Sequence, residues 1–132
     1  MNVGFTNGIS PTKLLIVDDN SEMRKLLRLT FSTGDYEILE AEDGNQAVNI
    51  IMRENPQIVL LDVMMPGELD GFAVCNFIKS STLKYTWVIM LTAKGQQEDI
   101  DTGWQIGADF YVTKPFSPLA LIELVEKLVV RD

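Results

Sequence analysis

The chain has 132 residues, 46% of them hydrophobic, which is enough to bury the core of one domain of ordinary size and excludes a disordered tail. Its formal net charge of −8, with no histidine, gives no electrostatic reason to bind nucleic acid or an anionic membrane, because such a surface repels phosphates. One cysteine, Cys75, excludes an internal disulfide, and no apolar stretch has the length or flanks of a signal peptide or membrane span. A reducing cytoplasm is therefore the expected location.

The first half of the chain predicts a flexible leader over residues 1–12 and the start of one folded domain that extends over residues 13–130. The leader is rich in glycine and polar residues and has little periodicity. The apolar run LLIVDD, at 14–19, predicts a strand, and the helix after it would be capped by Asn20 or Ser21. Tyr36 to Glu40 is a weaker strand candidate. The helix that follows it should stop before Pro56, because a residue before proline disfavours helical geometry.

The second half continues the alternation of strands and helices. Ile58 to Leu61 is apolar without alternation, as expected for a strand that helices cover on both faces. Further elements are expected as a helix near Leu69 to Lys79, a strand at Trp87 to Leu91, a helix at Gln96 to Ile106, a strand at Phe110 to Val112, and a last helix with Ser117 as cap and Pro118 at its first position. Five βα units joined by right-handed crossovers predict an α/β fold with a doubly wound parallel sheet.

Polar residues follow the predicted strands. They are Asp18, Asp19, Asp62, Thr92 and Lys114. Ligands of an open parallel sheet collect at the carboxyl ends of its strands, so one polar site is expected there. Three clustered carboxylates repel one another unless a cation lies among them, and Mg²⁺ usually combines one or two carboxylates with waters and phosphate oxygens. The alternative is that the aspartates merely cap the helices that follow them.

The set Asp18-Asp19, Asp62 followed by Met65-Pro66, Thr92-Ala93 and Lys114-Pro115-Phe116 resembles the receiver (phosphoacceptor) domain of two-component response regulators. The resemblance covers nearly the whole chain. It implies a flavodoxin-like (βα)5 sheet with strand order 2-1-3-4-5. It also implies a signalling switch whose Asp62 accepts a phosphoryl group from a sensor histidine kinase, a phosphotransfer protein or a small phosphodonor. Such a domain is not an enzyme beyond its own phosphotransfer and autodephosphorylation.

The same resemblance implies a role for each residue of the site. Asp19 and Asp62 would bind Mg²⁺ directly, with Asp18 acting mainly through water and the backbone carbonyl of Met64 as a further ligand. Lys114 would pair with the phosphoryl oxygens, and its bond to Pro115 would be cis. The Thr92 hydroxyl would move toward the phosphoryl group, and Tyr111 would be the aromatic residue that swings inward afterwards. Thr92 and Tyr111 could instead be ordinary strand and core residues.

Other positions bear on phosphoryl lifetime and on output. Met64 and Lys94 lie two residues after Asp62 and Thr92, where this family tunes access of the hydrolytic water. The loop MMPGELDGF is one residue longer than the commonest form. Trp104, Phe110 and Ile122 suggest an apolar output face on the last two helices and the last strand, although Trp104 could instead pack into the core beside Ile100. Leu124 stands where many relatives carry arginine. The expected partner is an output domain or another protein, with a phosphorylation-dependent homodimer as an alternative.

Two other functions are alternatives to this switch. A Mg²⁺-dependent phosphohydrolase with an aspartyl nucleophile typically has a second aspartate two residues after the first, and this chain has Met64 there. A nucleotide- or flavin-binding module is disfavoured because no G-x-G-x-x-G or G-x-x-x-x-G-K motif follows any predicted strand. The signalling switch is therefore the favoured interpretation.

Overall fold

The computed structural model describes residues 11–81, 85–93, 101 and 107–130. Within them a parallel five-stranded sheet has the order β2-β1-β3-β4-β5, which confirms the expected topology. The strands are β1 (Thr12–Val17), β2 (Tyr36–Ala41), β3 (Ile58–Asp62), β4 (Trp87–Ala93) and β5 (Phe110–Lys114). β1 begins two residues earlier than the run LLIVDD, because Thr12 and Lys13 pair with Tyr36 and Glu37. β5 extends two residues further than expected, through its pairing with β4.

The described residues form four helices, α1 (Ser21–Thr30), α2 (Gly44–Glu54), α3 (Gly71–Lys79) and α5 (Pro118–Val130). The side chains of Asn20, Asp43, Asp70 and Ser117 each accept a backbone N–H of the following first turn, as helix caps do. Asn20 is thus the cap of α1, and α3 begins two residues after Leu69. The helix expected over Gln96 to Ile106 lies outside the described residues, apart from Asp101.

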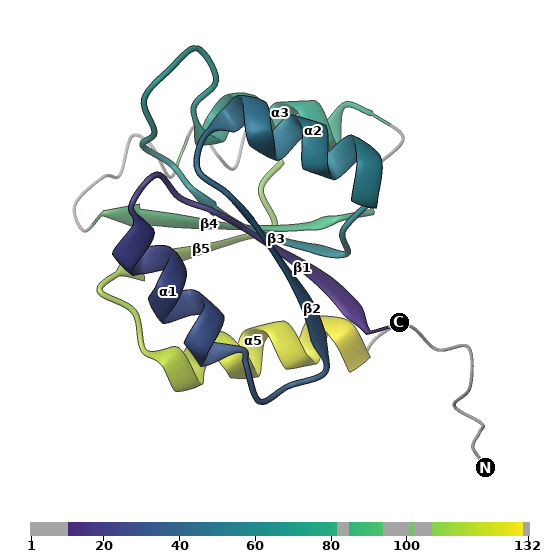
Figure 1. Ribbon diagram of the computed structural model, residues 1–132, viewed down its shortest axis with the longest axis vertical. Coiled ribbons are helices and arrows are strands. Elements are labelled where there is room, and N and C mark those ends of the chain that lie inside the picture. Colours follow the sequence, from purple (N-terminus) through teal and green to yellow (C-terminus); the bar gives the residue numbers. More distant parts are fainter. Residues whose placement is uncertain (1–10, 82–84, 94–100, 102–106, 131–132) are drawn as a thin grey trace.

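Helices cover both faces of the sheet (Figure 1), with α2 and α3 on one face and α1 and α5 on the other. Alternate residues of β1 belong to the cores on opposite faces of the sheet. Leu15 and Val17 pack with α2 and α3, whereas Leu14 and Ile16 pack with α1 and α5. This two-sided burial explains why the central strands are apolar without alternation. Cys75 is fully buried. No helix in the described ranges is long and apolar enough to cross a membrane.

The strand register places the predicted polar residues at one edge of the sheet. Val17 pairs with Leu61, so Asp18 follows β1 at the level where Asp62 ends β3. Asp62 in turn pairs with Leu91, next to Thr92, and Lys114 pairs with Ala93. The carboxyl ends of β1, β3, β4 and β5 thus converge, which is the location that the sequence predicted for the site.

Candidate functional site

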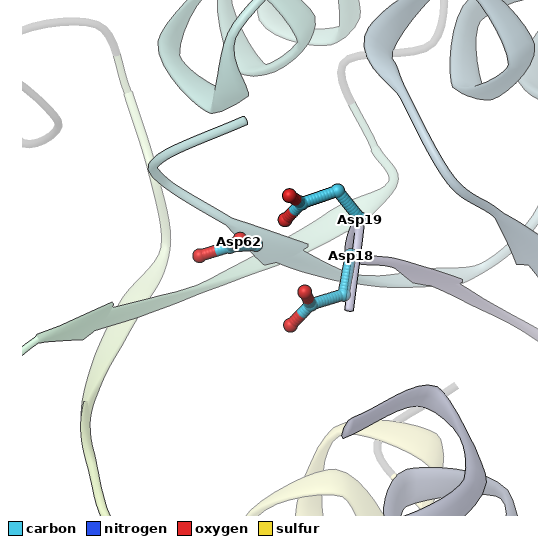
Figure 2. A group of neighbouring side chains, drawn as sticks. All are labelled: Asp18, Asp19 and Asp62. Atoms are coloured by element: carbon cyan, nitrogen blue, oxygen red, sulfur yellow. The ribbon is translucent and has the colours of Figure 1, made fainter. Parts of the chain in front are cut away.

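Three carboxylates meet at this edge of the sheet. Asp18, Asp19 and Asp62 each offer an oxygen, and these oxygens lie within 4.8 Å of one another. Figure 2 shows the side chains of Asp18 and Asp19 leaving the chain in different directions, with both carboxylates turned toward the side where Asp62 ends β3. Asp18 and Asp62 are 1% and 7% exposed, whereas Asp19 is open to solvent. The group therefore has two buried charges and one that solvent can reach.

Lys114 supplies a positive charge to this group. Its Nζ donates to Asp18 Oδ2 and to Asp62 Oδ1, both at 3.2 Å. Partial burial alone would lower the Lys114 pKa, but the charges of Asp62 and Asp18 raise it above its ordinary value, so the lysine is charged. Three carboxylates and one ammonium leave the group short of positive charge.

The raised pKa of Asp62 reflects this shortage of positive charge. Burial, and then the charge of Asp18, raise this pKa from 3.8 to about 6, although Lys114 and a backbone hydrogen bond from Met64 act in the opposite direction. A hard divalent cation would relieve the repulsion, and carboxylate oxygens are the ligands that Mg²⁺ prefers. The donor set of this chain therefore fits Mg²⁺.

A cavity of about 490 Å³ opens beside Asp19. It is lined by the loops that precede α2 and α3, including Glu42, Asp43, Pro66 and Glu68. Mg²⁺ gives up its waters reluctantly and usually keeps several of them, so space beside the exposed carboxylate suits such an ion. The sequence did not reveal this cavity, because it depends on how two loops distant in sequence are placed.

The backbone around the acidic group is held by neighbouring elements. Asp18 N donates to Ala41 O at 3.1 Å, and Asn20 N donates to Asp18 Oδ1 at 2.9 Å. Gly71, the first residue of α3, approaches β3 so closely that a Cβ atom there would lie 2.3 Å from Asp62 O. Its N–H donates to Val63 O at 3.0 Å. Residue 71 must therefore be glycine for the loop after Asp62 to close in this way.

The other expected site residues are placed as follows. Thr92 is 2% exposed, and its hydroxyl lies 3.5 Å from Ala93 O. Tyr111 is half-buried against the core under α2 and α3. The Met64 side chain is 66% exposed, and the proposed use of its carbonyl stays a prediction. The bond between Lys114 and Pro115 is cis, as expected.

Only part of the predicted output face belongs to the described residues. Phe110 and Ile122 are half-buried against the core under α1 and α5, and the Phe110 ring lies 6.3 Å from that of Trp87. Their role in an output face therefore stays a prediction. Lys94 and Trp104 lie outside the described residues.

Arg24 is a residue that the sequence analysis missed. Its Nη1 donates to the backbone carbonyl of Asp18 at 2.8 Å, and its Nε pairs with Glu40 on β2. In the sequence it reads as one of several charged residues on an amphipathic helix, so no signal there distinguishes it.

Comparison with known proteins decides the family. Residues 14–126 match the family model of the response regulator receiver domain. The chain belongs to the response regulator receiver domain family. It is 42% identical over 120 residues to the transcriptional regulatory protein ResD of Bacillus subtilis, covering 91% of this chain and 49% of ResD. This receiver domain thus spans about half the length of that relative.

Solved structures agree with this assignment. The receiver domain of the Francisella response regulator 1452 superposes with a TM-score of 0.82 at 32% identity, covering 92% of this chain and 98% of the other. The chemotaxis protein CheY4 of Vibrio cholerae gives a TM-score of 0.82 at 28% identity, with coverages of 90% and 99%. Membership in the family implies phosphorylation-controlled signalling.

Proposed function

We propose that this receiver domain is a switch in which Asp62 accepts a phosphoryl group from a sensor histidine kinase, a phosphotransfer protein or a small phosphodonor. The observation that carries the proposal is the contact of Lys114 Nζ with both Asp18 and Asp62, at the edge where Asp19 is open to solvent. This arrangement provides a nucleophile, a fixed cation and a set of metal ligands within one group.

The transfer requires an ionised Asp62. A carboxylate oxygen attacks phosphorus, an acyl phosphate forms, and the bond from phosphorus to the donor's nitrogen or oxygen breaks with its electron pair going to the donor. With a pKa of about 6, most of the Asp62 carboxyl is ionised at neutral pH even without a metal. Lys114 is placed to hold the phosphoryl oxygens. When bound by Asp19, Asp62 and the Met64 carbonyl, Mg²⁺ would neutralise charge on the transferring group.

The output follows from the residues around the acceptor. Thr92 and Tyr111 lie on neighbouring strands β4 and β5, so movement of the Thr92 hydroxyl toward a phosphoryl group frees space for Tyr111 to turn inward. Such a shift between two conformers typically couples sites by about 1 to 3 kcal/mol. The signal then passes to an output domain, another protein or a second copy of this chain through the face that includes β5 and α5.

The first test is labelling with acetyl phosphate and Mg²⁺, followed by intact-mass measurement. We expect one phosphoryl group on the parent and none on Asp62→Ala. Asp35→Ala removes an exposed carboxylate before β2, away from the acidic group, and should be labelled like the parent. Asp19→Ala should weaken Mg²⁺ binding and slow labelling. Equal labelling of Asp62→Ala and the parent would refute the assignment of the acceptor.

A further inference from the structure

The peptide that joins Asp18 to Asp19 lies just beyond the end of β1, so the sheet does not fix its orientation fully. Asp18 N still bonds to Ala41 O on β2, but β1 ends at Val17. A buried carbonyl without a partner costs about 1 to 3 kcal/mol, so Asp18 O requires a donor. Arg24 supplies it through Nη1 at 2.8 Å. Fixing this oxygen fixes the plane of the peptide that leads to Asp19.

Arg24 is itself fixed at a second point. Its Nε lies 3.1 Å from Glu40 Oε1, and its side chain is only 16% exposed. Although partial burial alone would raise it, the pKa of Glu40 is held below its ordinary value by the hydrogen bonds and charges of Arg28 and Arg24, so Glu40 is an anion. A planar guanidinium with two of its nitrogens bound has little freedom to turn. Arg24 therefore joins α1 and β2 to the carbonyl of Asp18.

Arg28 offers an internal comparison. It lies one helical turn further along α1 and pairs with the other oxygen of the same Glu40. Its remaining hydrogen bond goes to Ile38 O, not to the acidic group, and its side chain is 49% exposed. The two arginines thus share a helix, a charge and a partner, and they differ in the contact with Asp18.

We propose that Arg24 is a positioning residue for the metal ligands, holding the peptide between Asp18 and Asp19 so that both carboxylates face Asp62. This inference rests on the proposed Mg²⁺ site. It assigns Arg24 no contact with the metal or the phosphoryl group. Partners that orient a ligand from outside commonly change metal affinity by 10- to 100-fold when they are removed.

The test compares Arg24→Met with Arg28→Met. Each variant loses one positive charge from α1 and keeps a residue of good helix propensity, so long-range electrostatics and helix formation change similarly. Mg²⁺ affinity is measured by calorimetric titration. We expect Arg24→Met to weaken Mg²⁺ binding about tenfold or more and Arg28→Met to change it less than about threefold. Equal affinities in the two variants would overturn the inference.

A second readout separates positioning from general stability. We expect the Mg²⁺ concentration for half-maximal labelling by acetyl phosphate to rise in Arg24→Met, with the labelling rate at saturating Mg²⁺ near that of the parent. A purely structural role would lower the folded fraction and the labelling amplitude without shifting that concentration, which would contradict the inference.

Arg24→Lys covers the case in which Arg24→Met does not fold. Lysine keeps the charge but cannot reach Glu40 and Asp18 O with a planar pair of donors, so binding should still weaken severalfold. Parent-like affinity in Arg24→Lys would show that charge alone suffices and would overturn the inference. If the parent itself shows no saturable Mg²⁺ binding, the proposed function fails and this inference fails with it.

Discussion

The two ends of the sheet hold their charges in different ways. At the carboxyl end, the ion pairs among the described residues are those of Lys114 with Asp18 and with Asp62, and Asp19 lies close by. At the amino end, Lys79 Nζ lies 2.7 Å from Asp109 Oδ2 and also donates to Thr86 O, while Asp109 accepts Val88 N. One end is therefore electrostatically unbalanced and the other is paired. The comparison indicates that these charges are compensated at the amino end, whereas the carboxylates at the carboxyl end repel one another in a way that a bound cation would relieve.

The largest expected effect comes from breaking the paired end. Lys79→Met leaves the Asp109 carboxylate, which is largely shielded from solvent, without its cation and removes the donor to Thr86 O. We expect a loss of about 2 to 4 kcal/mol in the free energy of unfolding, measured by urea denaturation. Lys25→Met, which breaks an exposed pair on α1, is the control and should change stability by less than about 0.5 kcal/mol. Similar losses in both variants would contradict the comparison.

Removing a negative charge from the carboxyl end of the sheet should instead increase the free energy of unfolding. The pKa of Asp62 is about 6 in the folded chain and near 3.8 when unfolded, so the folded state holds this proton more tightly. Without metal, the contribution of Asp62 to the free energy of unfolding should therefore be fully present below pH 3.8 and be lost as the pH rises to about 6. At 1.36 kcal/mol per pKa unit, the total loss is about 3 kcal/mol.

The measurement is urea denaturation across this pH range in the presence of a chelator. Asp62→Asn should be more stable than the parent by about 2 kcal/mol at pH 7 and lose that advantage toward pH 4. Added Mg²⁺ should narrow the difference at pH 7, because it stabilises the folded parent. A variant that is less stable than the parent at pH 7 would show that the carboxylates are not in net repulsion.

Thr92 should give the smallest effect on stability. Among the contacts that the described residues offer, its buried hydroxyl reaches Ala93 O at 3.5 Å, the outer limit of a hydrogen bond. Thr92→Val should thus change unfolding free energy by less than about 1 kcal/mol, and it should leave labelling of Asp62 intact. Phosphorylation-dependent association, followed by sedimentation, should weaken. Association as strong as that of the parent would argue against the switch role of Thr92.

The sequence predicted the elements best where burial is complete. β3 is buried throughout, and its apolar run was identified as a strand between two helical layers. β2 is an edge strand that carries an exposed Glu37 and a half-buried Glu40, so its apolar pattern is weaker. The gathering of the three aspartates was also predictable, because parallel strands align their carboxyl ends.

The side-chain contacts that the sequence did not predict depend on tertiary packing, which brings together residues distant in the chain. Arg24 and Arg28 look alike in sequence, and only the folded chain shows that one of them reaches the Asp18 carbonyl. The pairing of Lys79 with Asp109 joins residues on α3 and just before β5 and has no local signature. The contact between the rings of Phe110 and Trp87 is likewise not encoded in local periodicity, because the two residues lie on different strands.

The tight approach of Gly71 to β3 has a consequence for how this chain can diverge. The hydrogen bond from Gly71 N to Val63 O closes the loop immediately after β3, so changes between Pro66 and Leu69 are separated from Asp62 by a fixed backbone junction. That stretch can therefore change in length without moving the Asp62 carboxylate. Because residue 71 has no Cβ, this close backbone contact can form. We therefore expect the sequence of the loop at 66–69 to tolerate substitution, whereas the position of Asp62 stays fixed.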